Sequence, residues 1–207
     1  MGIQDRKDRE KEEMRRLILD AAMKLFKENG FEDVSIRKIA DQIEYSPTTI
    51  YLHFENKDQI LLALHEEGFQ LLDQLFQSAL TIEDPIDRVH RFGELYMEFG
   101  LKNPEYYDLM FLKTGPMDAL SHDGEEDWKV GDHAFSYLLQ ASTEILERNP
   151  HMGIDAMTAA ISLWSMCHGF VCLQLRNRVC WYNIESMNSE QAGFLGLSWL
   201  SSLMKKK

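Results

Sequence analysis

The sequence has little of what marks a metalloprotein, a disulfide-rich protein or a common enzyme. Its three cysteines, Cys167, Cys172 and Cys180, lie in one late segment without a CxxC spacing, which predicts neither a zinc site nor a disulfide framework. Buried reduced thiols and a redox switch both stay open for them. No GxSxG, HExxH or phosphate-loop motif is present, so we predict a protein that is not an enzyme and needs no metal or cofactor.

Export and membrane signals are also missing. The first apolar cluster follows a charged opening, MGIQDRKDREKEEMRR, which is not the pattern of a secretory signal. No run approaches the ~18 uninterrupted apolar residues of a membrane span. We expect a cytoplasmic protein, and with 207 residues, 44% of them hydrophobic, the chain can bury a substantial core.

Strand-like alternation is absent, and apolar residues recur at helical spacing instead. The first apolar stripe starts at Met14 and ends at Asn29-Gly30, a typical helix stop. The pattern predicts an all-α protein of about nine helices. In the second half, helices are expected to begin at Pro85 and Pro104 and to run from about Trp128 to Arg148, Ile154 to Arg178, and Ser189 to the terminal lysines, with a loop over 114–127.

Three capped helix starts follow one another closely. Ser35 is a natural N-cap for one short helix, and Ser46 caps a second whose first position is taken by Pro47. Asn56 then caps a longer helix. Two short helices between longer ones, within about seventy residues, predict an N-terminal three-helix unit of the helix-turn-helix type.

The short helix that begins at Ser46 has an outer face suited to DNA. Ile50 and Phe54 are expected to point inward, which leaves the opposite face free. Short or flat side chains can approach base edges in the major groove, while hydroxyls, imidazole and amines grip phosphates. The predicted DNA-binding residues are Ser35, Arg37, Ser46, Pro47, Thr48, Thr49, Tyr51, Leu52, His53 and Lys57. For any single one of them, a helix cap or a solvated surface position stays open as the alternative.

The stretches ILDAAMKLFKENGFEDVSIRKIADQI and SPTTIYLHFENKDQIL resemble the DNA-binding domain of TetR-type transcriptional regulators. The resemblance implies an all-helical dimer that usually represses transcription and senses a ligand through a divergent C-terminal domain. It also implies that Thr48, Thr49, Tyr51 and His53 lie in the recognition helix, where the family contacts bases and phosphates. By the same resemblance Lys57 grips the DNA backbone, and Arg37 occupies a position that can touch a base. Glu44 departs from the family pattern, because glycine is common there, and so does Thr48.

Charge is unevenly distributed. Residues 1–55 contain ten basic and twelve acidic side chains, a net charge of -2, so residues 56–207 carry -10 of the total of -12. The N-terminal part is therefore not basic, and we expect modest, salt-dependent non-specific DNA affinity with specificity from the close fit of a dimer.

The C-terminal half is predicted to sense a ligand and to dimerise. The segment IDAMTAAISLWSMCHGFVCLQLRNR is apolar all round, so one side can line a cavity and the other a partner subunit. Gly193 and Gly196 permit close helix approach, which predicts a homodimer through the last two helices. Trp164, His168 and Gly169 resemble a tryptophan-histidine-glycine pattern of some TetR-type C-terminal domains.

The predicted function is a TetR-type repressor released from a pseudo-palindromic operator by a small molecule, with a DNA-binding domain at 1–55 and a ligand-binding and dimerisation domain at 56–207. A helical ligand-binding or metal-dependent bundle without DNA binding is the alternative, although only one acid-x-x-His motif, Asp87 to His90, is present. Predicted ligand contacts, each of which could instead be plain core, are Tyr96, Phe99, Tyr107, Met110, Phe111, Trp128, Phe135, Trp164 and His168.

Overall fold

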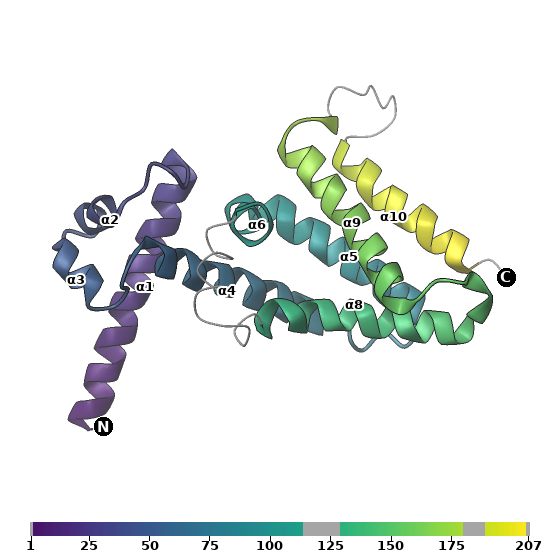
Figure 1. Ribbon diagram of the computed structural model, residues 1–207, viewed down its shortest axis with the longest axis horizontal. Coiled ribbons are helices and arrows are strands. Elements are labelled where there is room, and N and C mark those ends of the chain that lie inside the picture. The colour runs from purple at the N-terminus through teal and green to yellow at the C-terminus, as the bar shows by residue number, and fades with distance from the viewer. Residues whose placement is uncertain (1, 114–128, 180–188, 206–207) are drawn as a thin grey trace. The chain divides into compact units, whose positions relative to one another are not determined.

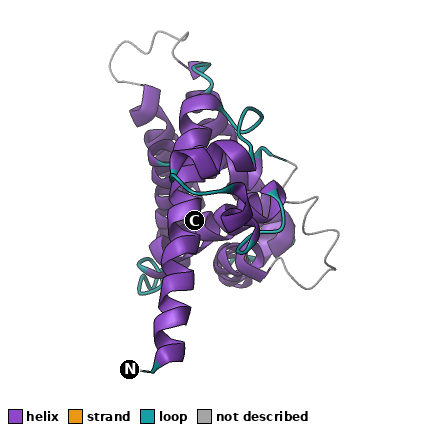
Figure 2. Cartoon of the chain, turned by 90° about the vertical axis from the view of Figure 1, so that its left-hand side faces the viewer, coloured by secondary structure: helices purple, strands orange, loops and turns teal. Residues whose placement is uncertain are grey.

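The computed structural model describes residues 2–113, 129–179 and 189–205, and within these ranges the chain is helical without a strand (Figures 1 and 2). The all-α prediction with about nine helices is confirmed for the described residues. The α-helices are α1 (Ile3–Asn29), α2 (Ile36–Gln42), α3 (Pro47–Tyr51), α4 (Lys57–Gln77), α5 (Pro85–Lys102), α6 (Pro104–Phe111), α8 (Lys129–Arg148), α9 (Ala156–Leu175) and α10 (Ser189–Lys205), with a short 3-10 helix at Pro150–Met152.

The chain forms two compact units. The first unit comprises Met1–Gly68 and Glu105–Asp127, and the second comprises Phe69–Pro104 and Trp128–Lys207. The first unit therefore continues past residue 55 into α4 and takes in most of α6. The division of function at residues 55 and 56 stays a prediction.

The predicted caps of the short helices are confirmed. The Ser35 hydroxyl accepts a hydrogen bond from the Lys38 N–H, and the Ser46 hydroxyl accepts one from the Thr49 N–H, each at 3.3 Å. At the start of α4 the Asn56 side-chain oxygen accepts from the Gln59 N–H at 2.9 Å. These contacts satisfy backbone donors that would otherwise lack partners in the first helical turn.

α1 extends well beyond its apolar stripe at the N-terminal end. It begins at Ile3 rather than near Met14, and its charged first turns are linked by Arg6 to Glu10 at 2.7 Å and Arg9 to Glu13 at 3.7 Å. Such pairs four residues apart each add a few tenths of a kcal/mol to a helix. At the other end Gly30 has a φ of 77°, a value that favours glycine, so the predicted stop is confirmed.

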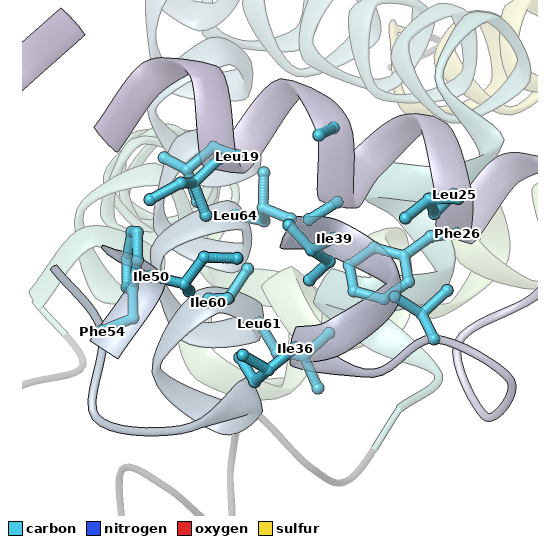
Figure 3. Close-up of a cluster of buried hydrophobic side chains, with 14 of the residues drawn as sticks. Leu19, Leu25, Phe26, Ile36, Ile39, Ile50, Phe54, Ile60, Leu61 and Leu64 are labelled. Carbon is cyan, nitrogen blue, oxygen red and sulfur yellow. The ribbon is translucent and has the colours of Figure 1, made fainter. Parts of the chain in front are cut away.

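The core of the first unit is built from all four of its N-terminal helices (Figure 3). Ile18 of α1, Ile39 of α2, Ile50 of α3 and Leu64 of α4 are fully buried, and Leu109 of α6 joins the same cluster. Burying a side chain of this size contributes roughly 1.5–3 kcal/mol. α2 and α3, which are too short to be stable alone, are held in place by this core.

The second unit packs α5, α8, α9 and α10 against one another. Gly193 allows α10 to lie close to α9 within the chain, because a Cβ there would lie 2.2 Å from the Phe170 ring. The predicted homodimer through these two helices stays a prediction. A Cβ at Gly196 would have no atom within 4 Å. Gly196 therefore makes no close helix contact within one chain.

The bounds of one predicted helix need correction. The helix expected from Ile154 to Arg178 spans Ala156–Leu175, because the Asp155 side chain caps its start and Asn177, with a φ of 53°, turns the chain after its end. The helix expected from about Trp128 to Arg148 spans Lys129–Arg148 among the described residues, which agrees with the prediction. Trp128, Cys180 and the loop expected at 114–127 lie outside the described residues.

By length and hydropathy alone, one helix in the described part of the chain, α9, could cross a membrane. Its Ala160, Cys167 and Val171 are buried, whereas Met157 and Ile161 are exposed. α9 thus packs one side within the second unit and leaves a second apolar side uncovered.

Candidate DNA interface and effector-sensing core

α3 presents a compact exposed surface. Tyr51 and Leu52 are 55% and 74% exposed, and Ser46, Pro47 and Thr48 are exposed beside them. The turn between α2 and α3 places Glu44 at a φ of 61°, a left-handed conformation that favours glycine and costs a residue with a side chain about 1 kcal/mol. This face points outward, as predicted. Leu52 is apolar although it is largely exposed, so packing within the chain does not account for its apolar side chain.

The other predicted DNA-binding residues surround this face. Ser35 and Arg37 are exposed at the start of α2. The half-buried Thr49 has its hydroxyl 3.1 Å from that of Ser46. Lys57 is half-buried, and its amine donates a hydrogen bond to the carbonyl of Phe31. Sequence reasoning missed this second role of Lys57, which fastens the start of α4 to the loop before α2.

Arg15 is a further residue that sequence reasoning missed. Its Nη1 donates a hydrogen bond to the carbonyl oxygen of His53 at 3.1 Å, and its guanidinium lies 4.3 Å from the centroid of the Phe54 ring. The pKa of His53 is lowered by burial and by the charges of Lys11 and Arg15, so its imidazole is neutral at pH 7. The sequence offered one indication of this role: Arg15 lies three residues before the apolar Ile18, and residues at this spacing share one face of a helix.

A second polar contact ties α6 into the first unit. The Glu67 carboxylate accepts hydrogen bonds from Arg16 Nη1 and from the Tyr106 hydroxyl, both at 2.7 Å. Burial and Glu67 together raise the pKa of Tyr106 to about 12. Next to them a Cβ on Gly68 would lie 2.5 Å from the Met110 sulfur, so α4 and α6 are in direct contact.

Four predicted ligand contacts come together in the second unit. Trp164 Nε1 donates a hydrogen bond to the Tyr96 hydroxyl at 3.0 Å, and the same oxygen lies 3.0 Å from His168 Nδ1. The Phe135 ring is 6.1 Å from that of Trp164, centroid to centroid. Burial lowers the pKa of His168, so its imidazole is neutral at pH 7. The other ring nitrogen, Nε2, lies 3.4 Å from the sulfur of Cys172, so the hydrogen-bonded group also includes that thiol.

The remaining predicted ligand contacts are placed differently. Phe99 is buried in the second unit, but Tyr107, Met110 and Phe111 belong to the first unit, where the Tyr107 and Phe111 rings are 5.0 Å apart. Cys167 was not among the predicted contacts; burial raises the pKa of its thiol to about 12, so it stays protonated. Within the described ranges, no three His, Cys, Asp or Glu side chains could together hold a metal ion.

Comparison with known proteins covers both halves of the chain. Residues 18–64 match the family model "Bacterial regulatory proteins, tetR family", and residues 89–186 match "Tetracyclin repressor-like, C-terminal domain". The chain belongs to the TetR family of transcriptional regulators. It is thus a TetR-family regulator with a helix-turn-helix DNA-binding domain, as its resemblance implied, and proteins of this family are generally not enzymes.

Individual relatives agree with this assignment. The TetR-family chain is 25% identical over 160 residues to the uncharacterized HTH-type transcriptional regulator YobS of Bacillus subtilis (strain 168), covering 76% of this chain and 77% of YobS. The fold is similar to that of the fatty acid degradation regulator FadR from Bacillus halodurans, with a TM-score of 0.68 and 17% identity over 92% of this chain and 93% of that one. It is also similar to AibR in complex with isovaleryl coenzyme A and operator DNA, with a TM-score of 0.66 and 17% identity over 90% and 96% of the two chains.

Proposed function

We propose that this TetR-family regulator is a cytoplasmic repressor that binds a pseudo-palindromic operator as a homodimer and leaves it when a small molecule binds the second unit. The observation that carries the proposal is the outer face of α3. Thr48 and Tyr51 of this five-residue helix are exposed, as is Leu52 directly after it. The inner side chain of the helix, Ile50, is fully buried. An exposed apolar and hydroxyl-bearing surface on a rigid support fits contact with base edges and thymine methyl groups.

The surrounding polar residues are assigned to the DNA backbone. Ser35 and Arg37 at the start of α2, and Ser46, Thr49, His53 and Lys57 around α3, supply hydroxyl, guanidinium, imidazole and amine groups. Such contacts fix the register of the helix on the duplex and carry no sequence information themselves. For Lys57 this requires that its amine engage a phosphate in addition to, or in place of, the Phe31 carbonyl.

The homodimer is proposed to form through α9 and α10. Both helices leave large apolar side chains uncovered in the single chain: Met157, Ile161, Leu173, Leu195, Trp199 and Leu203. Large apolar side chains that gather on the surface mark interaction sites. A two-fold contact of two helices from each chain would cover it and would hold two copies of α3 for half-sites about 34 Å apart.

The effector is proposed to bind at the cluster of Tyr96, Phe135, Trp164 and His168, with Phe99 nearby in the same unit. A largely apolar wall with a few polar groups suits a small, mostly apolar molecule that carries one hydrogen-bonding group. Trp164, His168 and Gly169 would then mark a C-terminal domain of the tryptophan-histidine-glycine type. Tyr107, Met110, Phe111 and Trp128 remain proposed contacts on the residue pattern alone.

Release requires that the effector favour a different arrangement of the dimer. α4 is a continuous helix whose first part, through Gly68, belongs to the first unit, while its remainder belongs to the second. The helix therefore gives a covalent route by which binding in the second unit can bias the position of α3.

The test is DNA binding by the purified protein at moderate salt. It should retard a fragment from the promoter of its own gene in preference to random DNA, and Leu52→Ala should abolish that preference while the dimer persists. Leu80→Ala, at a similarly apolar exposed position in the second unit, is the matched control. A wild-type protein without preference would exclude the repressor and would favour the alternative, a ligand-binding bundle without DNA binding; stoichiometric metal in the pure protein would favour the metal-dependent form of that alternative.

A further inference from the structure

The first turns of α1 carry an uneven arrangement of charge. Four cations and five acids occupy positions 5–13. Arg6 and Arg9 are each paired with an acid, Glu10 and Glu13 respectively. Lys7 and Lys11 have no acidic partner in the described part of the chain, so their charge remains available at the surface.

The unpaired lysines lie on one face of α1. Lys7, Lys11 and Arg15 are four residues apart and follow one another along the helix surface. The row is fixed in orientation by Arg15, whose side chain is bound to the His53 carbonyl just after α3. Arg9 stands two residues from each lysine, about 200° around the helix, and so points the opposite way.

Lys11 is also close to α3. Arg15 contacts the His53 carbonyl just after α3, and Lys11 lies one turn earlier on the same face of α1. In agreement with this position, the charge of Lys11 lowers the pKa of His53, as does that of Arg15. Asp8, on the flank of this row, accepts a hydrogen bond from Gln4 at 3.0 Å. Glu10 and Glu13 are each paired with an arginine, and Asp5 accepts a hydrogen bond from the Gly2 N–H. Glu12 follows Lys11 directly and lies about 100° further around the helix.

The row of Lys7, Lys11 and Arg15 extends along α1 beyond the end of α3. Eight residues separate Lys7 from Arg15, which is about 12 Å along the helix axis. The first turns of α1 continue past α3 within the first unit (Figure 1). A duplex laid on the exposed face of α3 carries one phosphate charge per about 1.7 Å of its axis, so its backbone beside the occupied groove would pass within reach of this row.

We propose that Lys7 and Lys11 bind the phosphate backbone next to the major groove that α3 enters. This proposal rests on the proposed function and extends its DNA contacts to a segment before the matched residues 18–64. It also bears on how a net charge of -2 over residues 1–55 is compatible with DNA binding: Glu10 and Glu13 are paired with arginines, whereas Lys7 and Lys11 share one face of α1 and have no acidic partner among the described residues. The contacts would raise affinity without changing sequence preference.

The test compares two double variants that remove the same charge from the same helical turns. Lys7→Ala/Lys11→Ala and the control Arg6→Ala/Arg9→Ala are titrated, as full-length dimers, against a promoter duplex and a scrambled duplex over a series of salt concentrations. The lysine variant should lower the slope of log affinity against log salt by about two and raise Kd on the order of tenfold for both duplexes. The control should change Kd less than about twofold, and Lys7→Arg/Lys11→Arg should retain the wild-type slope.

The outcomes separate this proposal from the proposed function. If the wild-type protein does not prefer the promoter duplex, both are overturned. If the wild-type protein prefers it but the lysine and arginine variants have equal slopes, only the role of Lys7 and Lys11 is overturned. A lysine variant with reduced helicity by circular dichroism is replaced by Lys7→Gln/Lys11→Gln, for which the same loss of slope is expected and an unchanged slope is decisive against the proposal.

Discussion

Arg15 on α1 holds the end of α3 through the main-chain carbonyl of His53, 3.1 Å from its Nη1, while its guanidinium lies over the Phe54 ring. The carbonyl groups at a helix C-terminus lack intrahelical partners, and a cation there is favourable. α3 has only five residues. Arg15 therefore contributes much to the orientation of α3, because it binds a carbonyl group just after the helix and lies over the Phe54 ring.

We therefore predict that Arg15→Ala weakens operator binding more than any surface change on α1. Loss of the hydrogen bond and the cation–π contact should lower the free energy of unfolding by about 1–3 kcal/mol. Arg15→Lys keeps the charge but loses the planar fork, so it should fall between the two proteins in both assays. Urea unfolding and DNA titration measure the two effects, and an Arg15→Ala protein with wild-type affinity would show that Arg15 does not position α3.

His65 of α4 predicts how stability depends on pH. Its side chain is 2% exposed, and burial lowers its pKa to about 4. The unfolded chain takes up the proton near pH 6.5, whereas the folded chain resists it, so the free energy of unfolding should fall between about pH 6.5 and pH 4, by up to about 3 kcal/mol for this residue.

The check is urea unfolding of the wild-type protein and of His65→Gln across that pH range. The variant should lose part of the slope, while His53 and His168, whose pKa values are also lowered, account for a remainder of the same sign. Equal slopes for the two proteins would assign the acid sensitivity to those other groups.

The short helices of the first unit could be predicted from the sequence because their signals are local. Ser35, Ser46 and Pro47 act within one helical turn, and each was found where expected. The contacts of Arg15 with His53 and of Lys57 with Phe31 join residues 38 and 26 positions apart. A periodicity argument assigns such residues to a face but cannot say which distant carbonyl they meet.

The predicted ligand contacts show the same limit in the second half of the chain. Aromatic residues near one another in the sequence were grouped together, yet Tyr107 and Met110 belong to the first unit and Tyr96 and Trp164 to the second. Both groups are apolar for packing reasons, and residue type does not separate a core position from a ligand contact. The hydrogen bonds that join Tyr96, Trp164 and His168 distinguish that group, and they become visible only in three dimensions.

Gly193 and Gly196 of α10 predict opposite responses to the same substitution. Gly193→Ala should destabilise the protein by about 1–3 kcal/mol, because its Cβ would overlap the Phe170 ring. Gly196→Ala meets nothing within 4 Å in one chain, so it should stabilise α10 by up to about 1 kcal/mol. Thermal unfolding of both variants measures the contrast. A loss for Gly196→Ala as large as that for Gly193→Ala would place Gly196 against the partner chain.

Trp199 provides the sharpest test of the proposed homodimer. Its side chain is 65% exposed in the single chain, on the same helix as the exposed Leu195 and Leu203. Trp199→Glu would place a charge in the interface, where desolvation without a partner is costly. We expect light scattering to show a monomer at concentrations where the wild-type protein is dimeric, together with loss of operator binding, because one copy of α3 cannot span two half-sites. Leu80→Glu, a charge introduced at another exposed apolar position of the second unit, should leave both properties intact. A Trp199→Glu protein that stays dimeric would move the interface away from the outer face of α10.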